Sequence, residues 1–332
     1  MTLRELFSTN PNIVINSDVD GMLCGMVLQK YFDCRVVGFS NSKEYVWLIP
    51  EIQDIDEPVY VDLFVARPRV ICIEQHIISY NGEHHQQIIN YGTKINPNLE
   101  RNRTFLGDMG VEYKYKYPFA TFHYILNLME REGISVELPD LNEIKQFHSY
   151  NAPNRIVETN AGHVILRADD ALYSTLLAFV DNAHDWWNWL NPYGTYESIS
   201  KLTDFIQTCN IENARHYKIS VGQFFSAIGC IEENDPFQND GSFRYVTNEE
   251  GDILPEVLYY RDVICSLIDM PLDLPVHYVI HHGTFEKFQC TQIRDINRLT
   301  IPRLYSYAFI YGPRIPRNNP SRNNFSYTLD MI

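Results

Sequence analysis

The chain is short of basic residues. It has 27 Lys and Arg against 42 Asp and Glu, which gives a net charge of −15 over 332 residues. Proteins that bind long duplex DNA without sequence preference use many Lys and Arg side chains to displace the counterions of the phosphates. The composition therefore excludes a general binder of long duplex DNA. A nucleic-acid partner would have to be short, or be held by a metal ion and a local basic patch.

The chain also lacks paired cysteines, a signal peptide and a membrane span. Its seven cysteines are odd in number and form no C-x-x-C motif, so we expect reduced thiols of a cytosolic protein. Met1–Glu5 begins no apolar signal segment, and no apolar run approaches the roughly 20 residues of a spanning helix. We therefore expect a cytoplasmic protein with no membrane partner. The cysteines are Cys24, Cys34, Cys72, Cys209, Cys230, Cys265 and Cys290.

What the chain does have is a globular composition, with 45% hydrophobic and 21% charged residues. Its length allows about two domains. The turn formers at 191–194 (Asn-Pro-Tyr-Gly) suggest a boundary, with one α/β domain over 1–193 and a smaller mixed α/β domain over 194–332. The predicted strands are 12–16, 34–39, 58–64, 69–74, 275–280, 303–311 and 325–329. The predicted helices are 21–32, 117–132, 137–150, 171–181, 195–209 and 257–269.

Strand and helix signals alternate through the first part of the chain. This order predicts a parallel sheet with right-handed crossovers and helices on both faces. Ligands of such sheets bind at the carboxyl ends of the strands. Functional residues are therefore expected where the apolar strands end.

The first predicted strand ends in Asp18-Val-Asp20-Gly21. Two carboxylates that converge in the turn after a strand favour a divalent-metal site. The alternative is a simple turn, because Asp and Gly are common turn formers.

Two further strands end in the same way, at Asp62 and at Glu74-Gln75-His76. Carboxylates and a histidine at adjacent strand ends can hold one or two divalent ions. For each residue alone, a capping or turn role remains the alternative.

The order of these motifs resembles the DHH phosphoesterase superfamily, in its nanoRNase and single-strand exonuclease branch. The resemblance rests on Asn16-Ser-Asp-Val-Asp-Gly21, on Val61-Asp62-Leu-Phe and on Ile73-Glu-Gln-His-Ile77. The run Val180-Asp-Asn-Ala-His-Asp-Trp-Trp-Asn-Trp189 is similar to a fourth motif of that branch.

The resemblance implies a metal-dependent phosphodiesterase that acts on short oligonucleotides or nucleotide phosphodiesters. It implies that Mn²⁺ or Mg²⁺ is held by Asp18, Asp20, Asp62 and either Asp181 or Asp185. His76 would contact the scissile phosphate or the leaving oxygen, with Glu74 orienting it.

The chain departs from the family pattern at three positions. Asn16 stands where the family has His or Asp, Gln75 replaces the ligand His of Asp-His-His, and Glu74 replaces its Asp. Amide oxygens at 16 and 75 are weaker ligands that suit Mg²⁺ better than Mn²⁺. The alternative function is a catalytically degenerate member that serves as a nucleotide-binding or structural subunit of a complex, or assembles with itself. A third interpretation is an unrelated α/β hydrolase or transferase.

Two histidine pairs complete the candidate residues. The resemblance implies a substrate-phosphate contact at His281, His282 and Gly283, at the end of a strand in the second domain. His84 and His85 are predicted to lie in a solvated polar loop, or else to replace a lost ligand.

Overall fold

The fold comes from a computed structural model. It describes residues 1–106, 115–138, 148–149, 152–156, 242–289, 302–310 and 324–332. The helices are α1 (Leu3–Thr9), α2 (Val19–Phe32), α3 (Gly82–Tyr91), α4 (Pro97–Glu100), α5 (Thr121–Arg131) and α10 (Pro255–Ile268). The strands are β1 (Asn12–Asn16), β2 (Arg35–Ser40), β3 (Tyr45–Leu48), β4 (Val59–Val61), β5 (Cys72–Ile73), β6 (Lys94–Ile95), β7 (His148–Ser149), β8 (Ala152–Ile156), β9 (Val279–His282), β10 (Thr284–Gln289), β11 (Leu304–Ile310) and β12 (Asn324–Leu329).

The protein is an α/β protein built on a seven-stranded, mostly parallel sheet. The strand order is β6-β5-β4-β1-β2-β3-β9, in which the first five strands are parallel and β3 runs antiparallel to both of its neighbours, β2 and β9. Within the described residues, no helix is long and apolar enough to cross a membrane.

The winding of the parallel strands reverses at β1. From β1 the chain crosses through α2 to β2 on one side, and later returns to place β4, β5 and β6 on the other side. The carboxyl ends of β1 and β4 therefore lie at the topological switch point, where open α/β sheets bind their ligands.

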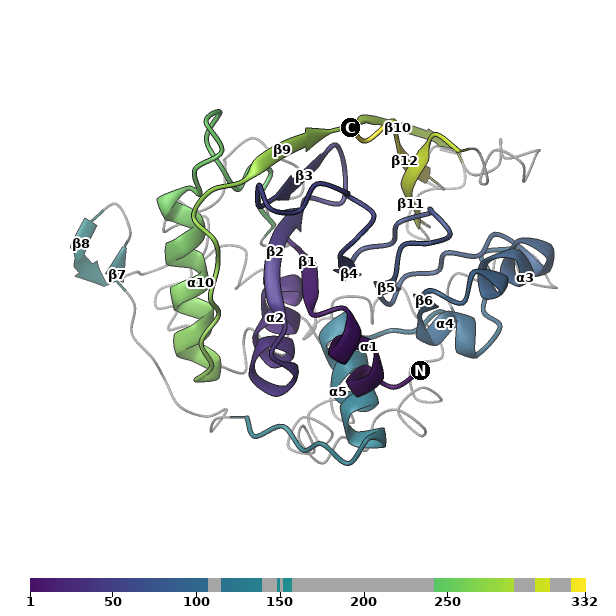
Figure 1. Ribbon diagram of the computed structural model, residues 1–332, viewed down its shortest axis with the longest axis horizontal. Helices are drawn as coiled ribbons and strands as arrows, with labels where there is room; N and C mark the ends of the chain where they lie inside the picture. Colours follow the sequence, from purple (N-terminus) through teal and green to yellow (C-terminus); the bar gives the residue numbers. More distant parts are fainter. Residues whose placement is uncertain (107–114, 139–147, 150–151, 157–241, 290–301, 311–323) are drawn as a thin grey trace, which may run out of the picture.

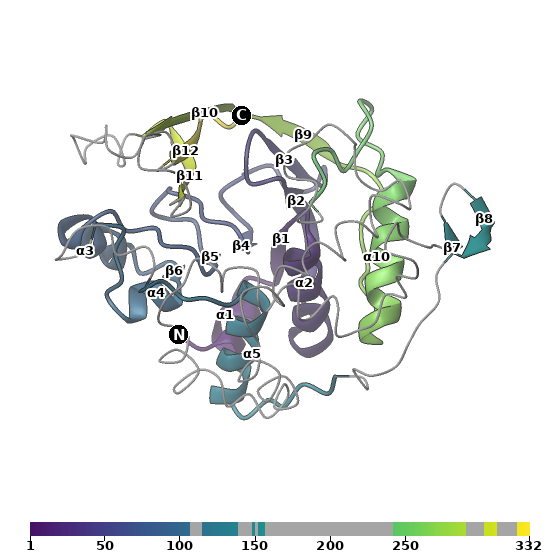
Figure 2. The same ribbon diagram turned by 180° about the vertical axis from the view of Figure 1, so that it is seen from behind.

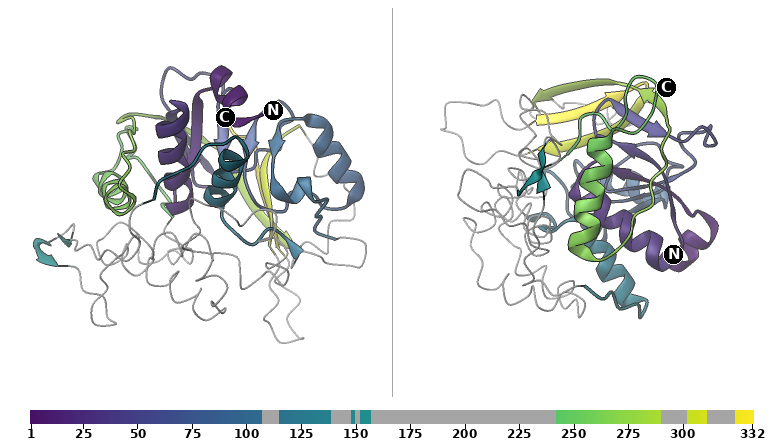
Figure 3. Two further views of the ribbon diagram at one scale, coloured as in Figure 1. Left: turned by 90° about the horizontal axis from the view of Figure 1, so that it is seen from below. Right: turned by 90° about the vertical axis from the view of Figure 1, so that its left-hand side faces the viewer.

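A second, three-stranded antiparallel sheet has the order β10-β12-β11. Strand β9 runs through Gly283 directly into β10, so a single stretch of chain links the two sheets (Figure 1). At this link, Gly283 donates its N–H to the Glu44 carbonyl at 2.8 Å. The preceding residue, His282, forms two backbone hydrogen bonds with Ile332. Figure 3 shows the small sheet at one end of the molecule.

Part of the expected second domain packs on the first sheet. Helix α10 lies beside α2, as the opposite views of Figures 1 and 2 agree, and its Tyr260 and Ile264 are fully buried in the main core. Strand β9 pairs with β3. The boundary expected at 193 lies outside the described residues, so the division into two domains stays a prediction.

Most described strand and helix predictions are confirmed, but two local predictions are wrong. His84 and His85 lie on α3, which Asn81 caps, and both are buried, because His84 packs against Tyr307 of β11 and His85 bonds Ser79 and Asn102. His84 Nδ1 accepts the Tyr80 N–H at 3.1 Å, and burial lowers the pKa of His84 to about 4. The helix expected over 137–150 is also wrong where it is described, since His148–Ser149 forms a strand with β8. The helices expected at 171–181 and 195–209 lie outside the described residues.

Gly21 allows α2 to begin directly against the end of β1. A Cβ atom at this position would lie 2.1 Å from the carbonyl oxygen of Asn16. We therefore expect Gly21→Ala to lower the free energy of unfolding by about 2–4 kcal/mol, despite the better helix propensity of alanine. Urea unfolding measures the change. Gly82→Ala, on α3 with nothing within 4 Å of the new Cβ, is the matched control and should cost nothing. Equal effects of the two changes would contradict this account of the β1–α2 junction.

Candidate functional site

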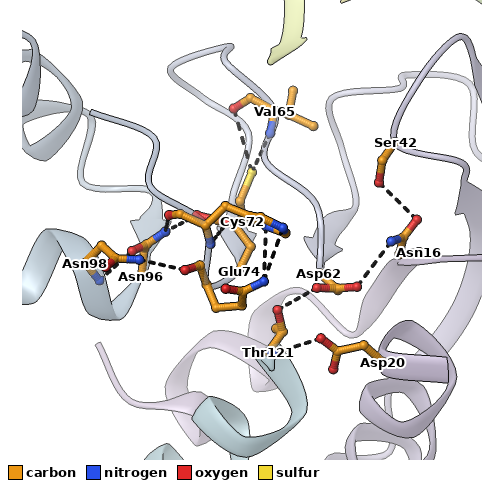
Figure 4. Close-up of polar contacts among 12 residues, drawn as sticks. Asn16, Asp20, Ser42, Asp62, Val65, Cys72, Glu74, Asn96, Asn98 and Thr121 are labelled. Atoms are coloured by element: carbon orange, nitrogen blue, oxygen red, sulfur yellow. Dashed lines mark hydrogen bonds and ion pairs between the residues drawn. The ribbon is translucent and has the colours of Figure 1, made fainter. Parts of the chain in front are cut away.

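Asn16 and Asp62 lie at the switch point, at the ends of β1 and β4. Asp62 has φ +61°, and its backbone N–H donates to the Ile73 carbonyl at 2.9 Å, which fixes the turn after β4. Asp18 caps α2 and accepts the Gly21 N–H at 2.9 Å. The structure thus brings Asn16, Asp18 and Asp62 within hydrogen-bonding distance. Figure 4 shows the contact between Asn16 and Asp62.

The Asn16 side-chain amide joins these two carboxylates. Its Nδ2 donates to Asp18 Oδ2 at 2.8 Å and to Asp62 Oδ2 at 3.2 Å. Its Oδ1 accepts the Ser17 N–H and the Ser42 hydroxyl, both at 3.0 Å. Rotation of the amide by 180° would point its nitrogen at the Ser17 N–H and its oxygen at the two carboxylates, so these three partners fix its orientation.

Asp20 has different hydrogen-bond partners from Asp18. It accepts the backbone N–H groups of Thr121 at 2.9 Å and Phe122 at 2.8 Å, and so caps α5. The N-cap residue of α5, Ala120, offers no side-chain cap of its own. A carboxylate is favourable here because it satisfies unpaired N–H groups at the positive end of the helix dipole.

Thr121 links Asp20 to Asp62, and the sequence analysis missed it. Its hydroxyl donates to Asp62 Oδ1 at 2.6 Å, while its backbone N–H binds Asp20. A threonine at the start of a predicted helix is a recognisable signal. Nothing in the sequence, however, indicates a contact with an aspartate 59 positions earlier.

Glu74, Gln75 and His76 form a neighbouring cluster at the end of β5. Glu74 accepts the His76 N–H at 2.6 Å and an N–H of the Asn96 amide, and lies 3.3 Å from His76 Nδ1. Gln75 Nε2 lies 3.2 Å from His76 Nε2. Gln75 Oε1 is buried and has no hydrogen-bond partner among the described residues.

The remaining candidates are placed elsewhere or lie outside the described residues. His281 and His282 end β9, at the same edge of the sheet as Asp62 but four strands away, or roughly 19 Å at about 4.8 Å per strand. Gly283 gives its N–H to Glu44, and a Cβ there would lie 2.6 Å from Thr328 Cγ2. Its place is therefore explained by close packing. Asp181 and Asp185 fall outside the described residues.

Burial raises the pKa of both Asp20 and Asp62. The pKa of Asp20 rises to about 7, chiefly through burial and then through the charge of Asp18. Burial raises the pKa of Asp62 well above its ordinary value, and the charge of Asp20 adds to the rise. His76 lies close enough for its charge to oppose that rise. The two carboxyl groups therefore retain protons at pH values where exposed aspartates have lost them.

As placed, these side chains do not fit a divalent cation. The amide nitrogen of Asn16 lies between two of the carboxylates, and the oxygens of Asp20 and Asp62 accept protein N–H and O–H groups. Among the described residues, no group of three or more His, Cys, Asp or Glu side chains is arranged to hold a metal ion. The arrangement shown is a hydrogen-bonded junction of β1, β4, α2 and α5.

Comparison with known proteins adds no relative. No family model, no curated protein and no solved structure matches the chain. The fold and the site therefore define the class only as an α/β protein with polar residues at the switch point of its sheet.

The raised carboxyl pKa values predict how stability depends on pH. Between about pH 4, where unfolded aspartates ionise, and about pH 7, the folded state holds protons that the unfolded state has lost. The contribution of Asp20 to the free energy of unfolding of the protein is therefore greatest below pH 4, and it is lost as the pH rises to 7. We expect a loss of about 1–4 kcal/mol, since one pKa unit corresponds to about 1.4 kcal/mol. Urea unfolding across this range measures it.

Asp20→Asn should flatten that pH dependence, because it removes the carboxyl group that titrates. Glu249→Gln, at an exposed position, is the control and should leave the slope unchanged. An Asp20→Asn protein with the wild-type slope would show that other groups cause it.

Proposed function

We propose that the protein is a catalytically silent member of the DHH phosphoesterase type, which serves as a structural or binding subunit of a complex. The observation that carries the proposal is the position of the Asn16 amide nitrogen between Asp18 and Asp62. A metal ion would need oxygen ligands directed at that point. Here a neutral hydrogen-bond donor satisfies both carboxylates.

The contacts of Asp20 and Asp62 support the same function. Asp20 uses one oxygen for each of two backbone N–H groups, and Asp62 uses one for Thr121 and one for Asn16. Binding a cation would cost several of these hydrogen bonds, each worth about 0.5–1.5 kcal/mol with a neutral acceptor and about 1.5–3 kcal/mol with a charged one. Asn16 and the three aspartates would thus stabilise the fold. The protein would act through surfaces that bind its partners.

A metal-dependent phosphodiesterase remains the second candidate, and Gln75 favours it. Its Oε1 is buried beside His76 with no partner in the described ranges, and an amide oxygen of this kind can accept a hydrogen bond or contribute to a Mg²⁺ site. This function would require Asn16 and the three aspartates to rearrange.

The stability of the silent protein should not respond to metal. We expect the wild-type thermal unfolding midpoint to be the same in EDTA, in Mg²⁺ and in Mn²⁺. In contrast, Asn16→Asp places a third carboxylate against Asp18 and Asp62, so it should destabilise the metal-free protein and regain the loss in Mn²⁺. Asn248→Asp, exposed and on the 247–253 turn, adds the same charge as a control and should show no metal response. Wild-type stabilisation by Mn²⁺ would overturn the proposal.

An activity assay separates the two candidates. We expect no Mn²⁺- or Mg²⁺-dependent hydrolysis of bis-(p-nitrophenyl) phosphate or of short dinucleotides by the wild-type protein. Hydrolysis that Asp20→Asn abolishes, while Glu249→Gln retains it, would establish the phosphodiesterase and contradict the silent function.

A further inference from the structure

An exposed aromatic patch lies where β3 and β9 form the end of the large sheet. The β9 patch consists of Tyr45, Arg244, Tyr245, Ile280 and His282. The register pairs Tyr45 with His282 and Trp47 with Ile280, so these side chains share one face. Tyr45 packs against Tyr245 at 5.4 Å and against His282 at 5.0 Å between ring centroids. Tyr245 and Ile280 are each 37% exposed.

Arg244 gives the β9 patch an exposed guanidinium group. It lies 5.2 Å from the centroid of the Tyr245 ring. Ion pairs with carboxylates hold Arg67, Arg69, Arg131, Arg261 and Arg303. Among the described residues Arg244 has no such partner, although acidic residues greatly outnumber basic ones in the chain. A guanidinium group held over a ring is well placed to receive a carboxylate from another molecule.

Within the part of the chain that the structure describes, the backbone of β9 also offers a short open edge. On the edge away from β3, Tyr278 donates to the Gly251 carbonyl and His282 pairs with Ile332. Because the backbone groups of a strand alternate between its two edges, those of Ile280 point to this same edge, between the two bonded residues. An extended peptide can therefore place one backbone pair against Ile280 while its side chains contact the patch.

We propose that the β9 patch binds an extended segment of a partner protein in which an Asp or Glu stands next to a large apolar residue. The carboxylate would pair with Arg244, and the apolar side chain would cover Tyr245 and Ile280. Exposed Tyr and Arg with apolar neighbours have the composition of interface hot spots. A second copy of the chain is disfavoured by the repulsion of two molecules of charge −15. The proposal names the partner of the structural subunit, but it does not depend on the chemistry of the Asp20–Asp62 junction.

Fluorescence anisotropy with short synthetic peptides tests the proposal. The peptides carry Leu or Phe beside Glu, and matched sets replace Glu with Gln or Lys. We expect the Glu peptides to bind at least about tenfold more tightly than the Gln set, and the Lys set not to bind. Arg244→Gln and Tyr245→Ala should each weaken binding by a similar factor. Amide hydrogen exchange should slow at Ile280 when the Glu peptide is bound.

Two variants serve as matched controls. Arg35→Gln removes an exposed arginine at the opposite end of β2, and Ile89→Ala removes an exposed isoleucine on α3; both should bind as the wild type does. No binding of any peptide, equal loss in the controls, or tighter binding of oligothymidylate than of the Glu peptide would each overturn the proposal. The metal-response and hydrolysis experiments test whether the protein is catalytically silent, and the peptide experiments test the β9 patch. Either proposal can therefore fail while the other holds.

Discussion

The side-chain amide of Asn16 is the interaction on which the rest of the site depends. It bridges carboxylates from the end of β1 and the end of β4, and its own oxygen is held by Ser17 and Ser42. Buried carboxylates are costly unless hydrogen bonds or charges compensate them. The neutral donor of Asn16 gives hydrogen bonds to the buried Asp62 and the partly buried Asp18.

The same polar contacts connect elements that are distant in the sequence. Asp20 caps α5, and Thr121 at the start of α5 holds Asp62 after β4. The first turn of α5 therefore cannot move away from the sheet without breaking the hydrogen bonds of the partly buried Asp20 and one hydrogen bond of the buried Asp62. Such a loss is expensive in an interior of low polarity. In this protein, the residues that suggest chemistry also position the helices.

Several parts of the fold were predictable because they depend on local patterns. The apolar run at 12–16 and the turn formers after it indicate a strand followed by a helix, and the structure has both. The histidines at 84 and 85 were not predictable in this way. Their segment is polar, and only packing against Tyr307 and the Ser79 and Tyr80 region shows that they are buried.

The sequence by itself determined that acidic and amide side chains follow the strands of a parallel sheet, because strand periodicity and turn residues act over a few positions. The tertiary structure decided what those side chains do. The direction of the Asn16 amide depends on Ser42, and the role of Asp20 depends on a helix that begins about a hundred residues later. Hydrogen-bond partners of this kind are set by the packing of whole elements, and local sequence preferences carry no information about them.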